Sequence, residues 1–99
     1  METRIQTIHF DASEQLKNFI QKKVSKLEQY FDGILLSDVI LKVVKPETAN
    51  NKHASIRLKI KNGECFAEKI ADSFEESIDV CVEALEKQLL RFKEKSRSK

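Results

Sequence analysis

The sequence predicts an α+β fold with the element order β-α-β-β-β-α. Residues 54–61 alternate strictly between apolar and polar side chains, which is typical of a strand with one buried face. Residues 16–31 and 74–92 repeat apolar side chains at intervals of three and four, which indicates two helices with one buried stripe each. Both helices are therefore expected to cover one face of a four-stranded mixed sheet.

Length and composition favour a single folded domain. The chain has 99 residues, of which 40% are hydrophobic and 34% are charged. We expect residues 1–95 to form one domain, followed by a short, basic, flexible tail at residues 96–99. No apolar run approaches the roughly 20 residues of a membrane span, and the N-terminus lacks the apolar core of a signal peptide. A cytoplasmic location is therefore expected.

The first strand is expected over residues 3–10, which are rich in β-branched and aromatic side chains. Two of its isoleucines are three residues apart, which predicts a bulge or an early end of the strand. Either Asp11 or Ser13 can cap the N-terminus of the helix that follows. Gly33 is expected to cap the C-terminus of this helix.

The other three strands are expected over residues 39–45, 54–61 and 64–71. The dipeptide Asn62-Gly63 favours a tight hairpin turn, so the last strand should return antiparallel to the third. The first two strands are joined through a helix, which favours a right-handed parallel crossover. The sheet is therefore expected to be mixed.

The last helix is expected to begin after Asp72 or Ser73, each of which has a glutamate three residues later, as in a capping box. Its first half is acidic and its second half is basic, which matches the helix dipole at each end. The basic run is longer than the dipole explains. Beyond Lys93 no apolar residue remains, and the helix is expected to fray.

Charge is distributed unevenly along the chain, although its net value is only +2. Residues 42–61 contain six bases and one acid, residues 87–99 contain six bases and one acid, and residues 62–86 contain eight acids and one base. Such segregation supports a basic surface that faces a polyanion.

Two groups of residues are candidates for this surface. Lys87 and Arg91 are neighbours on one flank of the last helix, with Gln88 beside them. The first helix carries a matching group at Lys22, Lys23 and Lys26. If the helices lie side by side, these flanks could line one cleft that binds a phosphate backbone. The alternative interpretation, that both faces are only solvated, stays open on this evidence.

No catalytic or metal site is expected. The chain has only two glycines, which excludes a glycine-rich phosphate loop. His9 and His53 have no metal-ligand spacing, and Cys65 and Cys81 have no local base, so we expect two buried, reduced thiols. We expect no enzymatic activity, cofactor or small-molecule substrate.

Several segments resemble the ribosome hibernation promoting factor family, which includes the bacterial ribosome-associated inhibitor A. The resemblance spans nearly the whole chain, with the segments in the family's order. They are Lys26–Asp32 (KLEQYFD), Val39–Val43 (VILKV), Asn62–Glu64 (NGE) and Leu85–Leu89 (LEKQL), followed by Lys93.

This resemblance implies a fold akin to double-stranded RNA-binding domains, with both helices on one side of the sheet. It also implies binding to ribosomal RNA and neighbouring proteins of the small ribosomal subunit, in the channel of messenger RNA and of the A-site and P-site transfer RNAs. Translation would then be inhibited during slow growth or stationary phase. The family positions that contact RNA correspond to Lys23, Lys26, Lys87, Gln88, Arg91 and Lys93.

The chain departs from the family pattern in three places. Glu75 stands where many members have an aromatic residue, and Glu76 where they have small residues. Long-form members carry a second, dimerising domain after a linker, whereas this sequence stops at Lys99. The inhibitor-like short members end in an extended, acidic tail, whereas Ser96–Lys99 is short and basic. These features resemble the short, hibernation-promoting type. As an alternative function, the acidic segment Glu75–Glu86 could bind a basic protein partner.

Overall fold

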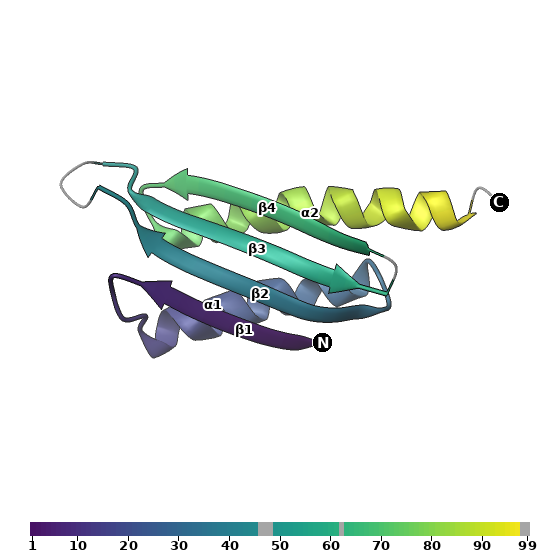
Figure 1. The fold of residues 1–99 in the computed structure, drawn as a ribbon, viewed down its shortest axis with the longest axis horizontal. Helices are drawn as coiled ribbons and strands as arrows, with labels where there is room; N and C mark the ends of the chain where they lie inside the picture. Colours follow the sequence, from purple (N-terminus) through teal and green to yellow (C-terminus); the bar gives the residue numbers. More distant parts are fainter. Residues whose placement is uncertain (46–48, 62, 98–99) are drawn as a thin grey trace.

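Four strands form one sheet, and two helices lie against one of its faces in the computed structural model (Figure 1). The structure describes residues 1–45, 49–61 and 63–97, the last three by their backbone alone. The elements confirm the predicted order and are β1 (Glu2–Ile8), α1 (Glu14–Ser25), the 3₁₀ turn η1 (Lys26–Gln29), β2 (Ile34–Val43), β3 (Lys52–Ile60), β4 (Gly63–Ala71) and α2 (Phe74–Arg97).

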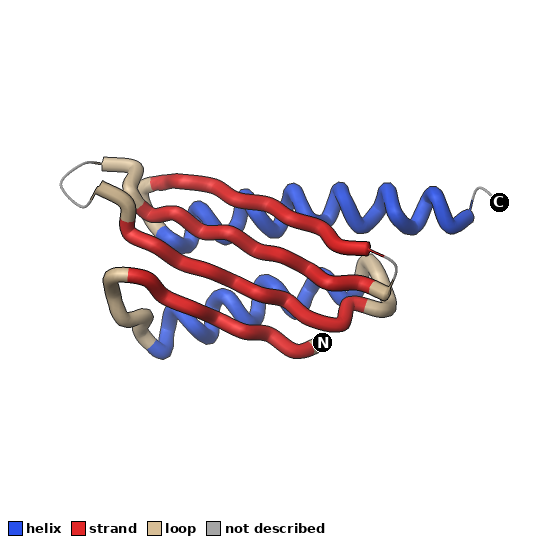
Figure 2. Tube along the Cα trace, viewed as in Figure 1, coloured by secondary structure: helices blue, strands red, loops and turns tan. Residues whose placement is uncertain are grey.

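The strand order in the sheet is β1-β2-β3-β4, with β1 parallel to β2 and the other neighbours antiparallel (Figure 2). The mixed sheet is therefore confirmed. Pairing between β1 and β2 is unbroken up to Ile8, so the first strand ends early and contains no bulge. The irregularity lies instead in β2, where the pairing with β3 shifts between Ile34 and Leu36.

Strand β2 begins at Ile34, five residues before the position expected from the sequence. The register shift at its start interrupts the alternation of buried and exposed side chains, and it leaves Leu35 60% exposed. Ser37, a polar residue, is fully buried further along the strand. A strand with these two features lacks the apolar alternation by which strands are recognised.

The core fills the space between the helices and the inner face of the sheet, as predicted. Both predicted stripes supply it, and both cysteines are buried free thiols. Burial raises the pKa of Cys65, and burial together with the charge of Glu68 raises the pKa of Cys81 to about 11. The largest fully buried side chains include Ile20, Leu27, Leu41, Ile56, Leu58, Ile78, Leu85 and Leu89.

Serines cap both helices at their N-termini. Ser13 Oγ accepts a hydrogen bond of 3.1 Å from the Leu16 amide, and Ser73 Oγ accepts one of 3.2 Å from the Glu76 amide. The expectation for Gly33 was wrong. Helix α1 continues as the 3₁₀ turn η1, and helical structure ends at Gln29. Gly33 lies four residues later, in the turn before β2, with φ at +103°.

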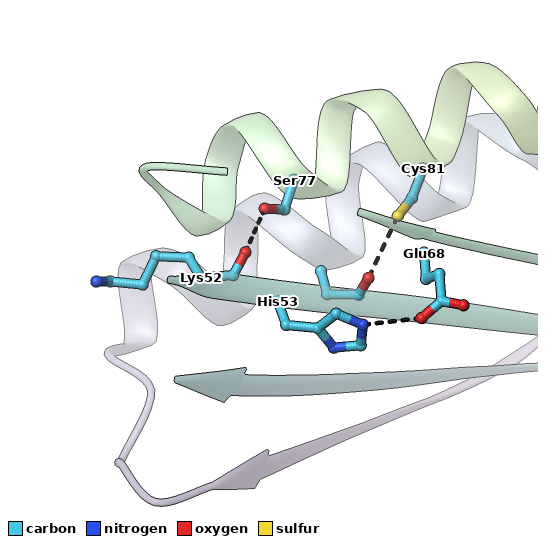
Figure 3. A network of polar contacts seen from close by, with 6 residues as sticks. Lys52, His53, Glu68, Ser77 and Cys81 are labelled. Carbon is cyan, nitrogen blue, oxygen red and sulfur yellow. Dashed lines mark hydrogen bonds and ion pairs between the residues drawn. The ribbon is translucent and has the colours of Figure 1, made fainter. Parts of the chain in front are cut away.

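Helix α2 is held at its start and extends past the sheet at its end. Ser77 Oγ donates a 2.6 Å hydrogen bond to the Lys52 carbonyl of β3 (Figure 3). Phe92 lies over Gly63, the first residue of β4, so the helical turns after Phe92 project beyond the sheet (Figure 1). The helix continues to Arg97, although fraying was expected after Lys93.

The hairpin between β3 and β4 returns antiparallel, as predicted. Gly63 pairs with Ile60 and is therefore already part of β4, whereas the expected turn placed it in the loop. Asn62, the other residue of that turn, lies outside the described residues, as do Ser98 and Lys99 of the tail.

Candidate nucleic-acid interface

Helices α1 and α2 lie side by side on one face of the sheet (Figure 2), and the predicted site residues belong to these two helices and to η1. Lys22 of α1 and Lys26 of η1 are both exposed, and Lys26 lines the hollow between the two helices. Neither lysine forms an ion pair with a residue that the structure describes. Their ammonium groups are therefore available to an anionic partner.

Lys23 lies between the helices and is not available in the same way. Its Nζ is 3.0 Å from Asp79 Oδ1 of α2, and it also lies 5.6 Å from the centroid of the Phe19 ring. The side chain is about one-third exposed, so this ion pair is only partly screened by water. Lys23 thus bridges the two helices.

The groove between the helices contains more acids than bases. A hollow of about 340 Å³ is lined there by Lys23, Lys26, Asp79, Val82, Glu83 and Glu86. The flank of α2 that faces α1 is therefore acidic, because the side chains at positions 79, 83 and 86 share it.

Lys87, Gln88 and Arg91 lie on the opposite flank of α2, above β4. Gln88 fixes this orientation, because its Nε2 donates a 2.8 Å hydrogen bond to the Phe66 carbonyl and its Oε1 accepts one of 3.2 Å from the Phe66 amide. A separate hollow of about 310 Å³ is lined by Val80, Glu83, Ala84, Lys87, Gln88 and Arg91.

The expectation of one basic cleft was therefore wrong. The acidic flank of α2, formed by Asp79, Glu83 and Glu86, separates the lysines of α1 from the basic flank of α2. The stripe of α2 was predicted correctly, but the flank that faces α1 depends on how the helices lie across the sheet.

Lys93 returns to the α1 side of the molecule. It is exposed and lines a third hollow, of about 310 Å³, together with the end of η1 and the turn that follows. The other lining residues are Gln29, Tyr30, Phe31 and Asp32. Tyr30 and Phe31 end the apolar pattern predicted over residues 16–31, and this hollow was not predicted. The aromatic pair between two polar residues at a helix end was the signal for it.

The open face of the sheet also carries bases, and acids pair with some of them. Arg57 Nε lies 3.8 Å from Glu64 Oε2, and His53 Nε2 lies 2.9 Å from Glu68 Oε1 (Figure 3). Arg4 Nε is similarly 3.1 Å from Glu2 Oε2. The base-rich segment at residues 42–61 is therefore offset only in part, because Lys59 is exposed and has no ion-pair partner among the described residues.

Over the described ranges, no group of His, Cys, Asp and Glu side chains is arranged to hold a metal ion. In the same part of the chain, no helix is long and apolar enough to cross a membrane.

Curated relatives match the chain over almost its full length. A ribosome hibernation promoting factor of Pseudomonas putida is 29% identical over 98 residues, which cover 99% of this chain and 92% of the relative. A protein of the same name from Escherichia coli K12 is 32% identical over 95 residues, or 96% of each chain.

Solved structures share the fold. The N-terminal domain of Thermus thermophilus Protein Y is 25% identical with a TM-score of 0.80, and the match covers 93% of this chain and 99% of that domain. A ribosomal subunit interface protein from Coxiella burnetii has a TM-score of 0.84 at 22% identity, and the match covers 94% of this chain and 98% of that one. The sequence profile of the Sigma 54 modulation protein / S30EA ribosomal protein family matches residues 3–97, so the chain belongs to this family.

Proposed function

We propose that this chain is a non-enzymatic ribosome hibernation factor of the cytoplasm. It binds the small ribosomal subunit in the channel of messenger RNA and transfer RNA, and it inhibits translation in slow growth or stationary phase. One observation carries the proposal. In a chain that matches the family from residue 3 to residue 97, five exposed basic side chains of the helical layer lack an ion-pair partner among the described residues: Lys22, Lys26, Lys87, Arg91 and Lys93.

The arrangement of these bases supports contact with two phosphate strands. Lys22 and Lys26 form one basic edge, and Lys87 and Arg91 form the other. The acidic flank of α2 lies between them. Two separated edges can bind the two backbones that border a groove of folded RNA, whose recognition depends largely on shape and phosphate contacts. The acidic flank would repel a phosphate that approached between the two basic edges.

Lys23 and Gln88 take a different part in this proposal. Each already has a partner within the protein, so each orients a helix rather than presenting a free group to RNA. The ribosome-binding unit comprises residues 1–95, and the basic residues that follow add only nonspecific attraction.

Sedimentation with purified ribosomal subunits tests the proposal. We expect the protein to travel with the small subunit and with intact ribosomes at low salt, and to be released as salt rises, because phosphate binding displaces counterions. Absence from both particles at low salt would contradict the proposal. Adding messenger RNA and transfer RNA should displace the protein if the decoding channel is its site.

A second candidate function is binding of a basic protein segment to the acidic flank of α2. Asp79, Glu83 and Glu86 line the inter-helix hollow and favour this reading. A pull-down treated with nuclease separates the two functions, because only a protein partner is retained without RNA.

A further inference from the structure

We propose that the hollow at the end of η1 binds one unpaired nucleobase of the RNA partner, by stacking against Tyr30. This inference rests on the proposed function and names the chemistry that one of its contacts recognises. The hollow has a volume of about 310 Å³ and lies between the turn at residues 29–32 and the last turns of α2.

The aromatic wall of the hollow is held in place by the fold. Tyr30 follows η1 directly, and its backbone amide donates a 3.1 Å hydrogen bond to the Leu27 carbonyl. Phe31 packs edge-on against Phe92 of α2, with 6.5 Å between ring centroids. Tyr30 is half-buried, so its position is set by the protein while part of the side chain stays accessible. A preorganised aromatic side chain of this kind is a stacking platform for a base.

The polar wall suits the rest of a nucleotide. Lys93 is exposed, has no ion-pair partner among the residues the structure describes, and can bind a phosphate beside the base. The Gln29 amide offers a donor and an acceptor, and the Asp32 carboxylate offers acceptors, for the edge of the base. Lys26 lies one turn before Gln29, so the basic edge formed by Lys22 and Lys26 lies next to the hollow.

Other ligands use this combination less well. A lone phosphate would leave the aromatic wall unused and would be repelled by Asp32. A basic peptide would be repelled by Lys93 for the same reason. A nucleobase that carries its own phosphate uses the aromatic ring, the amide, the carboxylate and the ammonium group together.

Tyr30 makes the inference directly testable, because the chain has one tyrosine and no tryptophan. Tyrosine emission therefore reports on this hollow alone. We titrate the intact protein at low salt with a short single-stranded RNA and with an abasic oligonucleotide of equal length. Anisotropy of a labelled copy of each oligonucleotide measures binding independently. Base-bearing RNA should quench the emission as it binds, whereas the abasic chain should bind through its phosphates and leave the emission nearly unchanged.

Substitutions at Tyr30 give a second measurement. Tyr30→Leu should weaken binding of the base-bearing RNA about tenfold, the scale of one lost base stack, and should leave the abasic chain unaffected. Tyr30→Phe keeps the ring and should bind as the unchanged protein does. This variant guards against a loss that is due only to misfolding.

Two results would overturn the inference. One is equal quenching, or none, from both oligonucleotides while anisotropy shows binding. The other is no binding of either oligonucleotide at low salt. Neither result decides the proposed function, which depends on sedimentation with ribosomal subunits. An inference that fails while sedimentation succeeds would place RNA contacts on the basic edges alone.

Discussion

The helical layer and the open face of the sheet both carry bases, but the bases of the sheet are offset in part by acids of the neighbouring strand. On the sheet, Arg57 and His53 of β3 each meet a diagonal acid of β4, Glu64 and Glu68 respectively. On the helices, Lys22 is followed four residues later by Lys26, and Lys87 by Arg91, so the two bases of each pair are neighbours. The net charge of a strand face thus depends on its partner strand, whereas a pair of neighbouring bases on a helix can be recognised from the helix's own sequence.

The largest expected effect separates these two surfaces. Reversing charge on both basic edges, with Lys26→Glu and Arg91→Glu together, should weaken association with the small subunit about 100-fold at moderate salt, because two phosphate contacts become repulsive. Arg57→Glu on the sheet is the control and should change the affinity only slightly. Equal losses in quantitative sedimentation would mean that the sheet also contacts RNA.

The salt dependence sharpens the same contrast. The double variant Lys22→Gln and Lys26→Gln should lower the slope of log affinity against log salt by about 1 to 2, since each lost phosphate contact releases fewer counterions. Lys59→Gln, an exposed base on the sheet, is the matched control. A change in slope caused by Lys59→Gln would contradict the assignment of RNA binding to the helical layer.

Gln88 tests whether a residue with internal partners acts through structure. Gln88→Ala removes two hydrogen bonds to the edge of β4 and should lower the free energy of unfolding by about 1 kcal/mol in urea titrations. Affinity for the small subunit should stay close to that of the unchanged protein. Gln15→Ala, at an exposed glutamine of α1, controls for the substitution itself. Lost affinity at unchanged stability would instead make Gln88 an RNA contact.

The smallest expected effect concerns Lys23. Asp79→Asn removes its partner and frees one more cation, so affinity for the small subunit should rise about threefold and the salt slope should steepen by about 1. Glu75→Gln removes an exposed acid of the same helix and controls for the change in net charge. If Asp79→Asn lowers the affinity, the ion pair is needed to hold the helices in their binding arrangement.

Periodicity predicted the fold because each pattern is local. The alternation of Ala54, Ile56, Leu58 and Ile60 identified the inner face of β3, and all four are buried. The stripe of α2 was equally clear, and each N-terminal cap was narrowed to two candidates, of which Ser13 and Ser73 are the ones observed. Each of these features depends on residues within a few positions of one another.

The site could be predicted only in part, because it depends on tertiary neighbours. The sequence identified the basic residues of both helices but not that Asp79 would pair with Lys23, or that Phe66 would bind both ends of the Gln88 amide. Those partners come from distant parts of the chain. The side of α2 that faces α1 follows only from the placement of both helices on the sheet, which a helical wheel of one helix does not contain.

The projecting end of α2 can enter a narrower passage than the rest of the molecule can. The whole molecule measures 51 × 22 × 17 Å, whereas a single helix with its side chains is about 10–12 Å wide. Beyond Phe92 the helix continues without the sheet beneath it and carries Lys93 at its exposed surface. Residues 93–97 contain three bases and one acid, so the narrowest part of the molecule is basic, and it can reach into an RNA-lined passage that is too tight for the sheet to follow.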